Sequence, residues 1–236
     1  MQLFKLIAIY FFDLIDIFVH QKRIINCLKK NNINLKIYID VGSHKGLYTD
    51  LIKKHYITQK IFMFEPQKRI FQYIKKKYKK NKKIHIFNEA VSDKNIYQSF
   101  RLNHHDLTAS LSKLDSKNSY LKLKAKLFGV TPNKMIYETI KIKTITLSNV
   151  IKAKKIKKID LLKIDTEGHE FQVLKGLESK IKRVKYILIE FHNDKIFLKY
   201  DPKKVHNYLV KNNFILKNSF KFPFTTWEDR FYMNKL

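Results

Sequence analysis

The sequence contains few of the residues that interrupt or cross-link a chain. Its 236 residues include one cysteine, four prolines and five glycines. The lone cysteine, Cys27, excludes an internal disulfide and a cysteine-based metal framework. No Cys-His pattern surrounds it, so we do not expect it to act as a nucleophile. No stretch rich in proline, glycine or serine divides the chain. The length is about 1.6 times a nominal 150-residue domain, so we expect one elaborated domain.

Acidic residues are also scarce, with 20 Asp and Glu against 49 Lys and Arg, and the net charge is +29. Such a charge ordinarily suggests nucleic acid or an anionic membrane as a partner. Removing the twelve lysines of the two densest runs, residues 75–83 and 152–158, would still leave +17. The charge is therefore spread along a lysine-rich composition that also fits an AT-rich coding sequence. We interpret the runs as solvated surface and do not expect nucleic acid as a partner, with polyanion binding as the alternative.

The N-terminal region lacks an uninterrupted apolar run of membrane-spanning length. Asp13 and Asp16 interrupt it short of the roughly 20 apolar residues that a span needs, and no small-x-small cleavage site follows. Apolar side chains recur here every three or four residues, at Leu3, Phe4, Ile7, Tyr10, Phe11, Leu14 and Phe18. This spacing predicts an amphipathic helical segment over 1–30 that packs on the domain of a cytoplasmic protein. Peripheral contact with an anionic membrane, or with a partner, is the alternative.

From residue 31 onward, short β-branched runs alternate with amphipathic stretches, which predicts a mostly parallel sheet with intervening helices. The expected strands are 36–41, 60–64, 84–88, 159–164 and 186–191, with a final pair at 214–218 and 229–234. The expected helices are 47–55, 68–79, 167–175 and 203–211. The alternation stops at an irregular polar insertion near 104–135, flanked by extended stretches at 96–103 and 137–146. In a single domain over 31–236, such an insertion is a lid, a binding loop or a disordered segment.

Two glycines, Gly42 and Gly46, follow the first predicted strand in the segment DVGSHKG. Glycine permits a sharp turn and close approach of a ligand to the backbone, and the helix that follows offers unpaired N–H groups. The spacing matches neither the dinucleotide fingerprint nor a P-loop, so we expect neither NAD nor a nucleoside triphosphate. Glu65 ends the next strand, where a carboxylate accepts hydrogen bonds from ribose hydroxyls. Together these features predict a nucleoside-containing cofactor, although singly Gly42 also suits a turn and Glu65 a helix cap.

The ordered motifs over residues 37–233 resemble the FkbM family of S-adenosylmethionine-dependent methyltransferases. They are DVGSHKGLYT, FEP, NEAVSD, TLSNVI, IDLLKIDTEGHEFQVLKG, ILIEFH and RFYMNK. The resemblance implies an α/β class I methyltransferase fold, a Rossmann-like, seven-stranded, mostly parallel sheet with an antiparallel last strand and helices on both faces. It also implies S-adenosylmethionine as the cofactor and O-methylation of hydroxyls on sugars or natural products.

The resemblance further implies a set of cofactor-binding residues. The loop beside the methionine part is formed by Asp40, Gly42, Ser43, His44 and Gly46, the ribose is bound by Glu65, and the adenine is flanked by Asn88, Glu89 and Ala90. His44 departs from the family, which more often has Asn there. His169 likewise replaces a residue that is commonly small. The insertion residues 108–111 are expected to shape the acceptor side.

Transfer of a methyl group to a hydroxyl needs a base to remove the proton. Asp165, at the carboxyl end of the fourth strand, is the first candidate, because open α/β sheets bind their ligands at that edge. His169 and His192 are the next candidates, and we expect all three on one rim. A metal site of Asp165, His169 and Glu190 is an alternative, but no two of these have a diagnostic spacing, so we expect no metal.

Neighbouring charged residues also have structural interpretations. We expect Glu167 and Glu170 in the first turn of a helix, where its dipole stabilises carboxylates. Lys163 and Glu190 lie in strands that we expect at the centre of the sheet. A buried ion pair between Lys163 and an acidic residue would explain why charged side chains occur there.

The leading functional hypothesis is an O-methyltransferase with a sugar or glycan acceptor. An RNA methyltransferase is one alternative, motivated by the charge, but the Asn-Pro-Pro-Tyr type of motif is missing. A catalytically inactive, membrane-peripheral scaffold is the other, motivated by the N-terminal segment and the lysine runs. The sequence indicates neither the acceptor hydroxyl nor the oligomeric state.

Overall fold

A seven-stranded sheet forms the centre of the computed structural model, which describes residues 15, 19–104, 108–223 and 225–235. The strand order is β3-β2-β1-β7-β8-β10-β9. Its strands are β1 (Ile37–Val41), β2 (Lys60–Phe64), β3 (Ile84–Phe87), β7 (Ile159–Ile164), β8 (Val184–His192), β9 (Phe214–Lys221) and β10 (Trp227–Asn234). The first five strands in this order run parallel, and β10 is antiparallel to both β8 and β9. The predicted class I architecture, with its antiparallel last strand, is confirmed.

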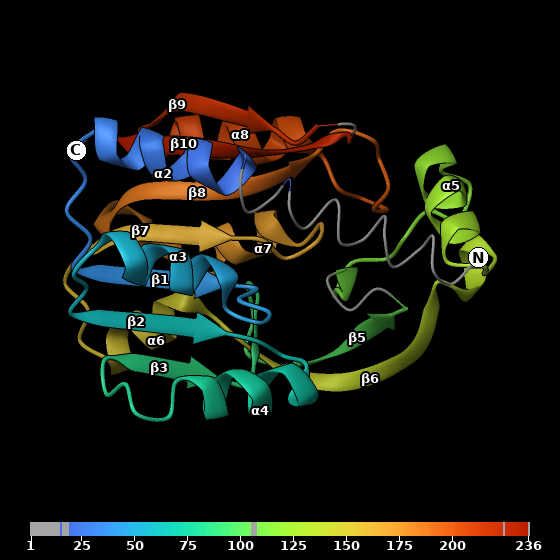
Figure 1. Ribbon diagram of the computed structural model, residues 1–236, viewed down its shortest axis with the longest axis horizontal. Coiled ribbons are helices and arrows are strands. Elements are labelled where there is room, and N and C mark those ends of the chain that lie inside the picture. Colours follow the sequence, from blue (N-terminus) through green and yellow to red (C-terminus); the bar gives the residue numbers. More distant parts are fainter. Residues whose placement is uncertain (1–14, 16–18, 105–107, 224, 236) are drawn as a thin grey trace.

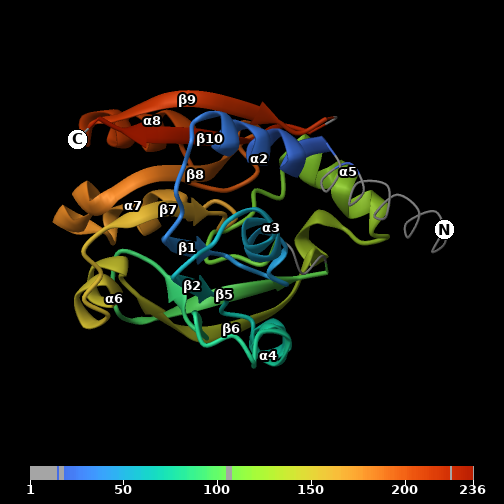
Figure 2. The same cartoon turned by 60° about the vertical axis from the view of Figure 1, so that its left-hand side comes forward.

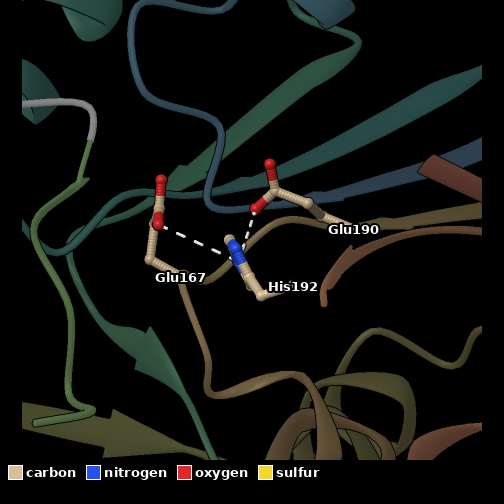
Figure 3. A group of neighbouring side chains, drawn as sticks. All are labelled: Glu167, Glu190 and His192. Carbon is tan, nitrogen blue, oxygen red and sulfur yellow. Dashed lines mark ion pairs between the residues drawn. The ribbon is translucent and has the colours of Figure 1, made fainter. Parts of the chain in front are cut away.

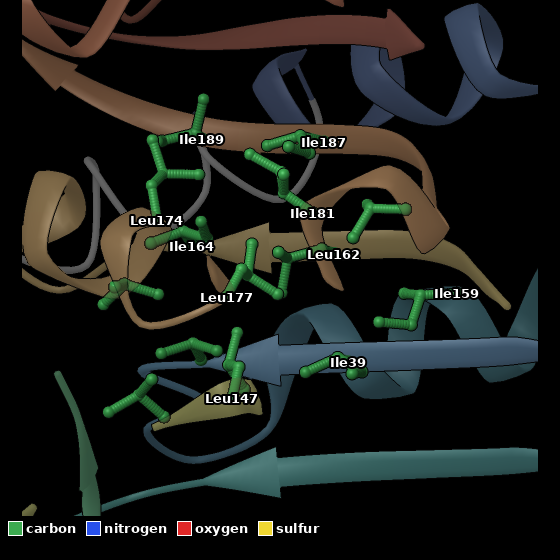
Figure 4. Packing of buried hydrophobic residues seen from close by; sticks show 14 of the residues in the cluster. Ile39, Leu147, Ile159, Leu162, Ile164, Leu174, Leu177, Ile181, Ile187 and Ile189 are labelled. Atoms are coloured by element: carbon green, nitrogen blue, oxygen red, sulfur yellow. The ribbon is translucent and has the colours of Figure 1, made fainter. Parts of the chain in front are cut away.

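Helices cover both faces of this sheet (Figures 1 and 2). The helices α2 (Gln21–Lys30), α3 (Leu47–His55) and α4 (Lys68–Lys77) belong to one face, and α6 (Leu147–Ala153), α7 (Glu170–Lys175) and α8 (Pro202–Lys211) to the other. Successive residues of a strand point to opposite faces, so Leu161 packs with the first group and Leu162 with the second. Figure 4 shows the second core, where Leu162, Ile164 and Ile189 meet Leu174 of α7. Burial on both faces explains why β7 has apolar side chains pointing in both directions.

The two extended stretches predicted on either side of the insertion are confirmed as strands of a second sheet. This sheet has the order β4-β6-β5 and comprises β4 (Ala90–Val91), β5 (Tyr97–Asn103) and β6 (Ile136–Ile145). Between its strands lie the helix α5 (Ser119–Leu127) and the short 3₁₀ helix η3 (Pro132–Lys134), and a second 3₁₀ helix, η4 (Glu178–Arg183), precedes β8. The expectation of an irregular region was therefore wrong for α5. Its N-terminus is capped by Asn118, and Leu121 and Ala125 bury one face against Phe197.

The N-terminal segment is described only in its second half. The amphipathic pattern of residues 1–19 falls almost entirely outside the described residues, so its packing on the domain stays a prediction and membrane contact stays the alternative. α2 packs Ile24 and Leu28 into the same core as Tyr38 and Phe220, and this helix also contains Cys27. Within the described part of the chain, no helix has the length and apolar character needed to cross a membrane.

Candidate active site

One cavity of about 620 Å³, counted with its open mouth, lies at the carboxyl ends of β1, β2 and β7. This edge is where an open parallel sheet binds ligands, and the insertion lies beyond it (Figure 1). Seven of the twelve predicted site residues line the cavity: Gly42, His44, Glu65, Glu89, Ala90, Asp165 and His169. The other five do not line it: Asp40, Ser43, Gly46, Asn88 and His192.

The turn after β1 lies directly against the end of β7. Gly42 has φ +79°, a left-handed conformation that disfavours other residues. A Cβ on Gly42 would lie 1.7 Å from the backbone oxygen of Asp165. The N–H groups of Gly42 and Ser43 both donate to the carbonyl of Phe64, 3.1 Å away in each case. The loops that end β1, β2 and β7 are therefore joined through the backbone.

Glu65 is buried at the end of β2 with its carboxylate fixed by backbone donors. One oxygen, Oε2, accepts from the N–H of His44 at 3.0 Å, and Oε1 accepts from that of Gln67 at 2.7 Å. A carboxylate oxygen accepts more than one hydrogen bond, so a fixed group of this kind is suited to receive sugar hydroxyls. Asn88 supports this turn from outside the cavity, because its amide donates to the carbonyls of Glu65 and Pro66.

Asp40 and Gly46 shape the start of α3 without lining the cavity. The carboxylate of Asp40 is completely buried and accepts from the hydroxyl of Thr49 at 2.8 Å, and burial raises the pKa of Asp40. Gly46, with φ +78°, precedes α3, and its carbonyl accepts from the hydroxyl of Tyr78 at 2.9 Å. These contacts fix the angle at which the chain leaves β1.

Asp165 forms an ion pair with Lys163 at the end of β7. The Lys163 Nζ lies 2.8 Å from Asp165 Oδ2, and Lys163 is only 2% exposed. Burial alone would raise the pKa of Asp165, but the Lys163 amine outweighs it and holds this pKa below the usual value. The buried Lys163 thus has an acidic partner, as the sequence suggested, but its ion pair is with the partly exposed Asp165 and not with Glu190. Asp165 stays ionised at neutral pH.

His169 lines the cavity but is engaged with another side chain. Its Nε2 lies 2.9 Å from the hydroxyl of Ser92, and burial lowers the pKa of His169 to about 4. The imidazole is therefore neutral at pH 7. His169 is the N-cap residue of α7, which begins at Glu170, three residues later than predicted. Glu170 Oε1 accepts from the N–H groups of Thr166 and Gly168, which closes the loop before the helix.

Glu167 lies in that loop and not in the first helical turn, so this prediction was wrong. Its φ of +54° and that of +85° at Gly168 prevent the helix from extending back to them. From this position Glu167 lies opposite Glu190 and His192 of β8 (Figure 3). The Nε2 of His192 lies 3.0 Å from Glu190 Oε2 and 3.9 Å from Glu167 Oε2. The pKa of Glu167 is raised, mainly by burial and secondly by the nearby carboxylate of Glu190.

Several cavity residues were not among the predicted set. Gln67 and Thr166 directly follow the predicted Glu65 and Asp165, so extension of each motif by one or two residues would have found them. Phe100, by contrast, comes from β5, and no motif marks it. Ala109 and Leu111, predicted to shape the acceptor side, line the same cavity as Glu65 and Ala90.

Comparisons with known proteins identify the family and the fold. The hexuronic acid methyltransferase AglP of Haloferax volcanii is 34% identical over 64 residues, which are 27% of this chain and only 25% of AglP. The crystal structure of methyltransferase FkbM from Methylobacillus flagellatus KT shares the fold, with a TM-score of 0.54 and 14% identity. That match covers 84% of this chain and 43% of the other. The family model described as the methyltransferase FkbM domain matches residues 40–216. Since that match covers three quarters of its length, the chain belongs to the FkbM methyltransferase family.

Proposed function

We propose that this protein is an S-adenosylmethionine-dependent O-methyltransferase whose acceptor is a hydroxyl of a sugar or glycan. The observation that carries the proposal is the single cavity in which the Gly42 turn, the fixed carboxylate of Glu65 and the ionised carboxylate of Asp165 meet. The sequence similarity to a hexuronic acid methyltransferase favours a sugar as the acceptor.

The cavity residues fit this cofactor. Gly42 presents bare backbone where a Cβ would collide with Asp165, and Glu65 is fixed to accept from ribose hydroxyls. The apolar side chains of Ala90, Phe100 and Leu111 supply surfaces against which a base can lie. S-adenosylmethionine supplies an activated methyl group on a positively charged sulfur, and the product thioether is neutral.

Asp165 is the base in this proposal. The bound cofactor would supply the methyl group to the acceptor oxygen and would keep the electron pair of the broken carbon–sulfur bond. The hydroxyl proton passes to the carboxylate of Asp165, which Lys163 holds in the ionised form. His169 is neutral and hydrogen-bonded to Ser92, and His192 contacts Glu190, so both are weaker candidates for the base than Asp165.

Calorimetric titration with S-adenosylmethionine and S-adenosylhomocysteine tests the cofactor. We expect micromolar binding that Glu65→Ala weakens about 10- to 100-fold, the value of hydrogen bonds to a charged group. Glu138→Ala, at an exposed position of β6, is the matched control and should bind normally. Absence of binding by either ligand would refute the proposal.

Transfer of a labelled methyl group to a panel of hexuronic acids and neutral sugars tests the reaction. We expect Asp165→Asn to lower the transfer rate about 10²- to 10⁴-fold while the affinity for S-adenosylhomocysteine is retained. Normal turnover in this variant would exclude Asp165 as the base.

A further inference from the structure

Three side chains from one loop and one strand converge beside the cavity: Glu167, Glu190 and His192 (Figure 3). Each presents one ligand atom, and these atoms all lie within 4.8 Å of one another. Glu190 and His192 are two residues apart on β8, so the strand presents both on one face. Glu167 reaches them from the loop after β7, whose left-handed backbone fixes its position.

Two of these atoms are buried without hydrogen bonds. Within the described residues, neither Glu190 Oε2 nor His192 Nε2 has a hydrogen-bond partner, and both are inaccessible to solvent. The residues are 7% and 5% exposed, and the two atoms lie only 3.0 Å apart. The contact between them is an ion pair rather than a hydrogen bond. Buried polar atoms are ordinarily hydrogen-bonded, so two adjacent atoms that both lack such a bond point to a missing ligand.

The charges of the cluster favour a cation as that ligand. Glu167 and Glu190 place two carboxylates around one imidazole, and the nearby Asp165 already has Lys163 as its partner. Lys124 of α5 interacts electrostatically with both glutamates, but one amine balances only one of them. A divalent cation would balance both.

We propose that Glu167, Glu190 and His192 bind a divalent first-row metal ion such as Mn²⁺. Two carboxylate oxygens and one imidazole nitrogen form a mixed donor set that suits Mn²⁺ or Zn²⁺ better than an all-oxygen ion. Ligand atoms about 2.1 Å from an ion lie about 3.0–3.4 Å apart, the separation that Glu190 and His192 already have. Glu167 lies farther away, with its Oε2 3.9 Å from the imidazole and all three ligand atoms within 4.8 Å of one another, so it needs a shift of about 1–2 Å.

Such an ion would lie next to the cavity, since Glu167 lines it together with Asp165. A metal ion with an open position binds a hydroxyl oxygen and lowers the pKa of that hydroxyl. The site would thus orient the acceptor and assist its deprotonation. This role rests on the proposed function, whereas binding of the ion does not.

The test is Mn²⁺ titration of the full chain after dialysis against a chelator, followed by calorimetry and by the electron paramagnetic resonance signal of free Mn²⁺. We expect one Mn²⁺ per chain, with affinity reduced about 10- to 100-fold or more by Glu167→Gln and by Glu190→Gln. Glu138→Gln, which changes an exposed glutamate of β6, should bind as the original chain does. Because Glu167 lies in a loop, Glu167→Gln tests the site even if Glu190→Gln fails to fold.

The proposal is overturned if the folded chain binds no Mn²⁺, or if Glu167→Gln binds it as tightly as the original chain. Titration with S-adenosylhomocysteine on the same samples separates the two proposals. Mn²⁺ binding without cofactor binding would refute the proposed function and keep the metal site, and the converse result would refute only the metal site.

Discussion

Replacing Gly42 by alanine tests whether the close contact between the ends of β1 and β7 builds the cavity. The left-handed φ of +79° costs an alanine about 1–2 kcal/mol. The new Cβ would also lie 1.7 Å from the carbonyl oxygen of Asp165, well inside contact distance. Asp165 cannot simply move away, since its N–H donates to Val41 at 3.0 Å. Such overpacking costs about 1–3 kcal/mol, so we expect a total loss of about 2–5 kcal/mol.

Urea denaturation followed by circular dichroism measures this loss, and Gly129→Ala provides the control. Gly129 also has a positive φ, of +68°, but lies exposed in the loop after α5. Alanine there carries the backbone cost alone, about 1–2 kcal/mol. The affinity for S-adenosylhomocysteine should fall about tenfold or more in Gly42→Ala only, because the strand ends that hold the cavity must separate. If Gly42→Ala is no less stable than Gly129→Ala and binds normally, the close contact is not what shapes the site.

Three further predictions concern buried polar groups. Lys163→Met removes the partner of Asp165, whose side chain is 32% exposed at the cavity wall. The free energy of unfolding at pH 7 should fall by about 1.5–3 kcal/mol, measured in urea, and an unchanged value would contradict the pairing. His169 stays neutral in the folded chain down to a pKa of about 4, whereas the unfolded chain takes up the proton first. The chain should therefore lose about 3 kcal/mol more stability than His169→Gln between pH 7.5 and 4, and parallel denaturation curves for both would argue against a buried neutral imidazole. Burial raises the pKa of Cys27, so its reaction with Ellman's reagent at pH 8 should be about tenfold or more slower than in the urea-unfolded chain; equal rates would show an accessible thiol.

The central sheet was predictable because its strands carry a simple signal. β2 and β7 were predicted at their observed bounds, since each is a short, mostly apolar segment with polar residues on both sides of it. The helices α3, α4, α7 and α8 were placed to within a few residues by their apolar spacing, whereas α6 was not predicted. The order of the motifs then put Gly42, Glu65 and Asp165 at one edge, because parallel strands end on the same side.

The features that the sequence did not predict depend on contacts between distant segments of the chain. α5 was missed because only Leu121 and Ala125 of its residues are buried, and lysines surround them. Their partner Phe197 is over 70 residues away in the sequence. Glu167 was placed in a helix because its left-handed backbone depends on the loop that Glu170 closes. The hydrophobic pattern of a short segment does not predict either contact.

The charge of the cavity is opposite to that of the chain, and this difference bears on the ligand. Four carboxylate side chains line the cavity, those of Glu65, Glu89, Asp165 and Glu167, and among the described residues no lysine or arginine does. The net charge of +29 therefore describes the surface and says little about the site. An acidic cavity attracts a sulfonium or a metal ion and repels the phosphates of RNA. Added salt should accordingly weaken any binding to RNA steeply while leaving cofactor affinity little changed, and titrations at low and high ionic strength would separate surface attraction from recognition by the site.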